Sequence, residues 1–214
     1  MSAAAISFGS TDGLALEGVL EGPDLPRACL VLCHPHPQMG GTMEAPLLKA
    51  LAQHLVGEGW AVLRFNFRGI GASQGRSSTG EAEVQDARGA LLWARARFPE
   101  RSVAIGGWSF GGAVAIRTAL ADPTIATCVA IAPAVRARPG VTAGLPPAPV
   151  GGVPVPTLLV AGANDEQIAP EEVSGWAKQA GARFVEVAGA NHFFWARYEK
   201  LADVVAGFLA ENVP

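Results

Sequence analysis

Short, mostly apolar runs alternate with longer stretches of helical periodicity along most of the chain. A strand covered on both faces needs no polar alternation, so such runs predict buried strands. The runs lie at residues 28–33, 61–65, 103–105, 128–131, 157–160 and 184–187. Helices are predicted at about residues 45–57, 84–98, 113–121, 170–180 and 198–209. Repeated strand–helix units of this kind predict an α/β fold, with a mostly parallel sheet and helices on both faces.

Two segments depart from this alternation. Near the N-terminus, residues 5–8 and 14–20 flank the turn residues 10–13, which predicts an antiparallel strand pair. Between Ile131 and Thr157 there are seven prolines and no helical pattern. Loops this long in a compact domain are usually functional or disordered. Because this one follows the carboxyl end of a strand, where open parallel sheets bind ligands, we expect residues 132–156 to form a substrate flap. A passive surface connection is the alternative.

Length and charge narrow the class of protein. The chain has 214 residues, half of them hydrophobic and 16% charged, which predicts one globular domain over residues 1–214. The formal net charge is −3 and the basic residues are not clustered, which argues against a nucleic-acid partner. No apolar run reaches the length of a membrane span of about 18 residues. We therefore expect neither a nucleic acid nor a membrane as partner, and the oligomeric state stays open.

The N-terminus and the cysteines point to a cellular compartment. The first residues contain no basic segment followed by a long apolar one, so no secretory signal is predicted. Cys29, Cys33 and Cys128 fall in apolar, strand-like runs without metal-ligand spacing. Three buried, reduced thiols are the expected arrangement, and a cytoplasmic location follows from it.

The motif Gly-x-Ser-x-Gly lies between a predicted strand and a predicted helix, with Gly107, Ser109 and Gly111 as its fixed positions. A serine on a sharp strand-to-helix turn has a strained backbone, and its neighbours two residues away must lack a Cβ so that the chains can pass closely. In return the hydroxyl projects above the sheet, near the positive end of the helix. A glycine-rich turn that happens to contain serine is the alternative, which the strand–turn–helix context disfavours.

A serine hydroxyl is a poor nucleophile at neutral pH and needs a base. His192 is the only histidine after Ser109, and it lies in a loop that follows the strand predicted at 184–187. The carboxylate that orients this base should lie on another loop at a strand end. Asp165, after the strand predicted at 157–160, is the candidate, and Glu166 is its competitor. The order serine, acid, histidine is that of the α/β-hydrolase superfamily.

Two further stretches carry a resemblance to a branch of that superfamily. They are residues 33–43, Cys-His-Pro-His-Pro-Gln-Met-Gly-Gly-Thr-Met, and residues 65–73, Phe-Asn-Phe-Arg-Gly-Ile-Gly-Ala-Ser. With the triad, they resemble a small, lidless bacterial branch related to dienelactone hydrolases and acyl-peptidase-like esterases. The resemblance covers nearly the whole chain and implies a sheet of about eight strands, with only the second antiparallel, and hydrolytic chemistry. True dienelactone hydrolases carry cysteine where this chain has Ser109, so their substrate is not carried over.

Acyl transfer places negative charge on the carbonyl oxygen, which needs two preorganised donors. The backbone N–H of Phe110, directly after the nucleophile, is predicted as one. The loop after the strand at 28–33 should supply the other. Pro35 and Pro37 have no N–H, so the backbone of His36 is the only donor between them. Hydrogen bonding within the loop is the alternative for both histidine side chains, and we expect it for that of His34.

Neither a metal nor another cofactor is expected. His34 and His36 lack a nearby carboxylate or thiol at a usual ligand spacing, except Cys33, whose side chain should point into the core. The glycines after Arg68 do not fit the dinucleotide motif Gly-x-Gly-x-x-Gly, so Arg68 is assigned a structural role.

These residues predict a serine hydrolase that acts on a small-molecule ester or similar acyl substrate, a carboxylic-ester hydrolase in type, through an acyl-enzyme. Five aromatic side chains flank the predicted site, which favours a moderately apolar acyl group. They are Trp108, Phe110, Phe193, Phe194 and Trp195. Two alternatives remain open: a ligand-binding or regulatory protein on a hydrolase scaffold, and a haloperoxidase or acyltransferase that uses the same triad.

Overall fold

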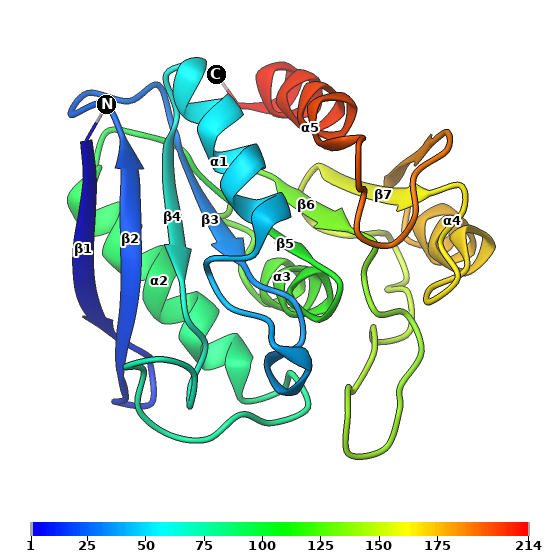
Figure 1. Ribbon diagram of the computed structural model, residues 1–214, viewed down its shortest axis with the longest axis horizontal. Helices are drawn as coiled ribbons and strands as arrows, with labels where there is room; N and C mark the ends of the chain where they lie inside the picture. Colours follow the sequence, from blue (N-terminus) through cyan, green and yellow to red (C-terminus); the bar gives the residue numbers. More distant parts are fainter. Residues whose placement is uncertain (1, 214) are drawn as a thin grey trace.

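The apolar runs of the sequence form one eight-stranded sheet in the computed structural model, which describes residues 2–213 (Figure 1). Its strands are β1 (Ser2–Gly9), β2 (Ala15–Gly22), β3 (Cys29–Cys33), β4 (Ala61–Phe65), β5 (Val103–Trp108), β6 (Cys128–Ile131), β7 (Thr157–Gly162) and β8 (Arg183–Val187). The strand order is β1-β2-β4-β3-β5-β6-β7-β8. β2 pairs antiparallel with both β1 and β4, and all other neighbours are parallel. The predicted α/β fold and its single antiparallel strand are confirmed.

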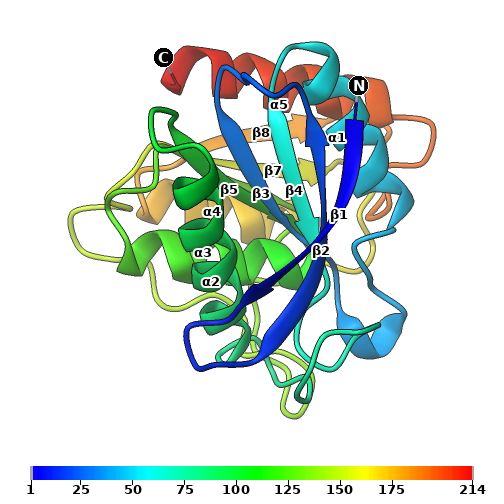
Figure 2. The same cartoon turned by 90° about the vertical axis from the view of Figure 1, so that its left-hand side faces the viewer.

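Five helices cover the two faces of the sheet (Figures 1 and 2). They are α1 (Pro46–Gly57), α2 (Glu83–Arg97), α3 (Phe110–Ala121), α4 (Pro170–Gln179) and α5 (Tyr198–Asn212), and a short 3-10 helix, η1, spans Pro37–Met39. α1 and α5 pack on one face, and α2, α3 and α4 pack on the other. Every strand and helix predicted from the sequence is present, with bounds that differ by a few residues.

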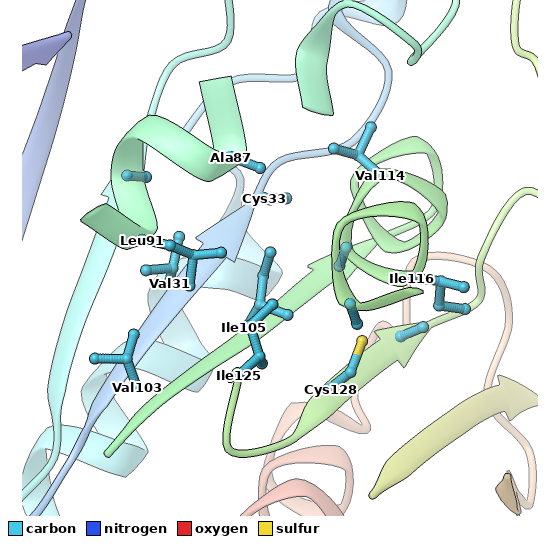
Figure 3. Packing of buried hydrophobic residues seen from close by; sticks show 14 of the residues in the cluster. Val31, Cys33, Ala87, Leu91, Val103, Ile105, Val114, Ile116, Ile125 and Cys128 are labelled. Atoms are coloured by element: carbon cyan, nitrogen blue, oxygen red, sulfur yellow. The ribbon is translucent and has the colours of Figure 1, made fainter. Parts of the chain in front are cut away.

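Alternate residues of each central strand enter opposite cores. In β3, Val31 packs toward α2 and α3, whereas Leu30 and Leu32 pack toward α1 and α5. Figure 3 shows the first of these cores, where side chains of β3, β5 and β6 meet those of α2 and α3. Strands buried on both faces read as continuous apolar runs, which is why the sequence reveals them.

The three cysteines are buried and free, as predicted. Burial raises the pKa of Cys29 and of Cys128 to about 12, so these thiols stay protonated at neutral pH. Within residues 2–213 no helix combines the length and the apolar character that crossing a membrane requires.

Candidate active site

Ser109 lies at the sharp turn between β5 and α3, in a strained backbone conformation with φ 56° and ψ −115°. The turn needs both glycines of the motif. A Cβ on Gly107 would lie 2.3 Å from the carbonyl oxygen of Gly111, and a Cβ on Gly111 would lie 2.3 Å from that of Cys33. The Ser109 N–H donates to the carbonyl of Ile131 at 2.8 Å, which ties the turn to β6. Close backbone passage therefore holds the strained residue in place.

Replacing Gly111 with alanine should lower the free energy of unfolding by about 1–3 kcal/mol, because the new methyl group overlaps backbone that cannot move freely. Gly175, inside α4, is the matched control, since a Cβ there meets no atom within 4 Å. Gly175→Ala should raise stability by about 0.5–1 kcal/mol through helix propensity. Urea unfolding of the two variants measures both effects. Wild-type stability in Gly111→Ala would contradict the close packing of this turn.

The structure brings Ser109, His192 and Asp165 together, each just beyond the carboxyl end of a different strand. The Ser109 Oγ lies 3.1 Å from Nε2 of His192, and Nδ1 of His192 lies 2.8 Å from Oδ2 of Asp165. His192 and Asp165 are only 5% and 7% exposed. An ionised carboxylate accepts the Nδ1–H, which leaves Nε2 free to accept the serine proton. The geometry is that of a nucleophile, a base and a group that orients the base.

The choice between the two adjacent carboxylates is decided by their surroundings. Asp165 is buried, and its Oδ1 accepts the backbone N–H groups of Gln167 and Ile168, each at 2.9 Å. Those two bonds hold the carboxylate so that Oδ2 faces His192. Glu166 is exposed, and no hydrogen bond or ion pair joins it to His192, whose imidazole pairs with Asp165. The arrangement favours Asp165.

The aromatic residues expected around the site occupy different places. The indole N–H of Trp108 donates to the carbonyl of His192 at 3.1 Å, which positions the histidine loop. Phe193 lies beside the imidazole and stacks on Trp195, whose side chain is 62% exposed. Phe194 is fully buried in the core beneath α1 and α5, so the prediction that it flanks the site is wrong.

The backbone N–H groups of His36 and Phe110 both belong to residues that line a cavity beside Ser109. Neither N–H donates a hydrogen bond to another atom of the described chain. In the His36 ring, Nδ1 accepts the Gln38 N–H at 3.2 Å, so Nε2 carries the proton and donates it to the carbonyl of Val141 at 2.8 Å. The side chain thereby ties this loop to the Pro-rich segment.

His34 makes the loop hydrogen bonds expected of it. Its Nε2 accepts the Phe67 N–H at 3.0 Å, so Nδ1 carries the proton and donates it to the carbonyl of Pro35 at 2.7 Å. The ring is fully buried. Burial disfavours the imidazolium and lowers the pKa of His34 from 6.5 to about 4.

Because of this shift, the free energy of unfolding should decrease as the pH is lowered through a defined range. Between pH 6.5 and about 4 the unfolded chain binds a proton at His34 and the folded chain does not, so the stabilisation is complete above pH 6.5 and is lost as the pH approaches 4. The full effect is about 3 kcal/mol. His34→Gln, which keeps an acceptor for the Phe67 N–H, should flatten the dependence of the unfolding free energy on pH over this range. An unchanged slope in urea titrations would contradict the assignment.

A cavity of about 170 Å³ opens beside Ser109, and the Pro-rich segment forms one of its walls. Residues within 134–142 and 167–172 line it, together with His36, Met39, Ser109 and Phe110. The wall is held by several elements: Arg117 of α3 donates to the carbonyls of Ala143 and Gly144, and the indole of Trp176 donates to that of Pro146. The charged lining residues of this wall were not found from the sequence, because nothing in a proline-rich loop marks which side chains turn inward.

Arg68 has the structural role expected of it. Its guanidinium pairs with the buried Asp86 at 2.8 Å and with Asp12 at 2.9 Å, which anchors the loop after β4 to α2 and to the β1–β2 turn. The ion pair with Arg68 on another element compensates the burial of the Asp86 carboxylate inside α2. Among residues 2–213, no three His, Cys, Asp or Glu side chains are grouped so that they could hold a metal ion.

Comparison with known proteins identifies relatives over most of the chain. The family model described as "Serine aminopeptidase, S33" matches residues 24–151. An uncharacterised protein of Rickettsia prowazekii is 31% identical over 208 residues, covering 90% of this chain and 85% of that protein. An α/β serine hydrolase homologue from Coxiella burnetii is 30% identical with a TM-score of 0.83, over 96% of each chain. An α/β serine hydrolase without a lid from Xanthomonas campestris is 26% identical with a TM-score of 0.84, over 100% of this chain and 96% of that one.

Proposed function

The chain belongs to the serine aminopeptidase family of α/β serine hydrolases, and we propose that it hydrolyses carboxylic esters through a triad of Ser109, His192 and Asp165. One observation carries the proposal. The Ser109 hydroxyl is hydrogen-bonded to a histidine that a buried carboxylate orients, and it opens on a cavity lined by two residues with unpaired backbone N–H groups. This combination supplies a nucleophile, a base and an anion-stabilising site within one small volume.

The proposed reaction has two halves. Nε2 of His192 takes the hydroxyl proton while the Ser109 Oγ attacks the carbonyl carbon, and the tetrahedral oxyanion is stabilised by the N–H groups of Phe110 and His36. As the carbon–oxygen bond of the ester breaks, His192 returns the proton to the departing alkoxide. Water then attacks the acyl-enzyme by the same route, which releases the acid and restores Ser109. Asp165 stabilises the imidazolium in both halves without taking its proton.

The charges around the cavity favour an ester over the amino end of a peptide. An aminopeptidase needs an anionic group to hold the substrate's α-ammonium. Glu172 is the one acidic residue of the described lining, and Arg136 pairs with it at 2.8 Å. A neutralised carboxylate attracts an ammonium group poorly.

A pre-steady-state measurement tests the proposal. Mixing the enzyme with a short p-nitrophenyl ester should release a burst of p-nitrophenolate equal to the enzyme concentration, and mass spectrometry should find the acyl group on the peptide that contains Ser109. Ser109→Ala should give no burst. An acyl group on another residue would exclude Ser109 as the nucleophile. Absence of turnover across several acyl lengths would overturn the proposal and favour a ligand-binding role.

A further inference from the structure

The cavity beside Ser109 holds an arginine without an acidic partner. Arg138 lies in the Pro-rich wall of the cavity. Its Nη2 donates to the backbone carbonyl of Gln167 at 3.2 Å, and Gln167 lines the cavity from the loop between β7 and α4. Within residues 2–213, no carboxylate pairs with Arg138, whereas Arg136 of the same wall pairs with Glu172 at 2.8 Å. The guanidinium has five N–H donors, so one bond to a carbonyl leaves it with donors to spare.

The balance of charge in the cavity is therefore positive. Its ionised lining groups are Arg136, Arg138 and Glu172, and after the Arg136–Glu172 pair cancels, one positive charge remains. The whole chain carries a formal charge of −3, so this local charge is opposite to that of the protein. A cleft with low-dielectric walls concentrates the field of such a charge and attracts anions.

The cavity lies on the acyl side of the scissile bond. Both oxyanion donors belong to residues that line it, Phe110 and His36, and so does the nucleophile Ser109. His192, which returns its proton to the departing alcohol, is absent from the described lining. The alcohol thus leaves on the His192 side, and the acyl group extends toward the Pro-rich wall.

We propose that the substrate is the ester of a short dicarboxylic acid, and that Arg138 binds the free carboxylate at the far end of its acyl group. This inference rests on the proposed ester hydrolysis and specifies its substrate class. A cavity of about 150 Å³ accommodates a benzene molecule, so one of about 170 Å³ suits an acyl group of roughly seven non-hydrogen atoms, such as succinyl. A planar guanidinium and a carboxylate match in two parallel hydrogen bonds. An anionic acyl group replaces the moderately apolar one that the aromatic residues suggested.

The test compares two methyl esters with acyl groups of nearly the same shape, monomethyl succinate and methyl 4-methylpentanoate. A pH-stat follows the acid released, and the measured quantity is the ratio of kcat/KM for the charged ester to that for the neutral one. Because Arg138 is exposed, Arg138→Gln should lower this ratio by about fivefold, the upper range for an exposed ion pair. Glutamine keeps a donor for the Gln167 carbonyl.

Two further variants separate local from global charge. Glu172→Gln releases Arg136 from its pair and should raise the ratio severalfold. Arg101→Gln changes the net charge of the protein by the same amount as Arg138→Gln, but Arg101 is exposed just before β5, at the end opposite Ser109. It should leave the ratio at the wild-type value.

The outcomes distinguish this inference from the function it rests on. If Arg138→Gln leaves the ratio unchanged, or if Arg101→Gln lowers it equally, carboxylate binding by Arg138 is wrong, while Ser109-dependent turnover of the neutral ester preserves the proposed function. If the wild-type enzyme hydrolyses neither ester nor any other simple ester, both the proposed ester hydrolysis and carboxylate binding by Arg138 are wrong.

Discussion

Ser109→Ala is expected to lower kcat for ester hydrolysis by about 10⁶-fold, the size of the loss when a triad nucleophile is removed. The hydroxyl lies 3.1 Å from the His192 Nε2, and alanine leaves that nitrogen with no proton to accept and the substrate with no attacking oxygen. The two backbone N–H groups and the cavity would remain, so hydrolysis above the rate in water should persist at a low level. Steady-state kinetics with a p-nitrophenyl ester measures the loss.

Ser109→Gly separates the loss of chemistry from loss of the fold. Glycine adopts φ 56°, ψ −115° with less strain than any residue that carries a Cβ. The glycine variant should therefore be more stable than the alanine variant by about 1 kcal/mol, although both lack the nucleophile. We expect both variants to be inactive to the same degree, and the glycine variant to have the higher melting temperature. Activity above a hundredth of wild type in either variant would exclude Ser109 as the nucleophile.

Asp165→Asn should lower kcat by about 10⁴-fold while leaving the protein folded. The physical reason is the tautomer of His192. In the wild type, Oδ1 of Asp165 accepts the N–H groups of Gln167 and Ile168, and Oδ2 accepts the Nδ1–H of His192. The amide oxygen of asparagine would keep the two backbone bonds, so its NH₂ group would face Nδ1. The imidazole would then carry its proton on Nε2 and could not accept one from Ser109.

Glu166→Gln is the matched control for that substitution. Glu166 is adjacent in sequence, carries the same charge and is exposed, with no hydrogen bond or ion pair to His192. Its kcat should stay within about twofold of wild type, as is usual for surface changes away from a site. Comparable losses in the two variants would point to a general charge effect and would remove Asp165 from its proposed role.

Much of the fold could be predicted from local pattern because the physics that forms its elements is local. Val84, Ala87, Leu91 and Ala94 recur at helical spacing, and α2 forms over Glu83–Arg97 with Ala87, Leu91 and Ala94 buried. Strands such as β3 are apolar throughout because helices cover both of their faces. Strand order is a different matter. It depends on pairing between distant segments. The turn at residues 10–13 predicted that β1 and β2 pair antiparallel, but only the resemblance to a family predicted that β2 is the one antiparallel strand of the whole sheet.

The proposed site likewise has features that the sequence predicts and features that only the folded chain provides. The glycine spacing around Ser109 is a local requirement of the backbone, so the sequence reveals it, and the positions of Asp165 and His192 after strands narrow the partners to a few candidates. The preference for Asp165 over Glu166 rests on burial and on two backbone bonds that only the folded loop provides. Phe193 and Phe194 are likewise indistinguishable in the sequence, yet Phe193 lies beside the imidazole at the edge of the core under α1 and α5, whereas Phe194 is fully buried in that core.

The sequence by itself determined the class of the fold and the strained serine turn, because both depend on spacing along single segments. It also gave the chain order of the residues proposed as the triad, since each follows a strand that an apolar run predicts. Only the tertiary structure decided which groups meet in space: the unpaired charge of Arg138 beside Ser109, the pairing of Arg136 with Glu172, and the imidazole of His36 bonded to the carbonyl of Val141. Each of these contacts joins segments that are far apart in the chain, and one partner in each lies in the Pro-rich loop, which has no periodic pattern. Their formation depends on packing between elements, which no local pattern encodes.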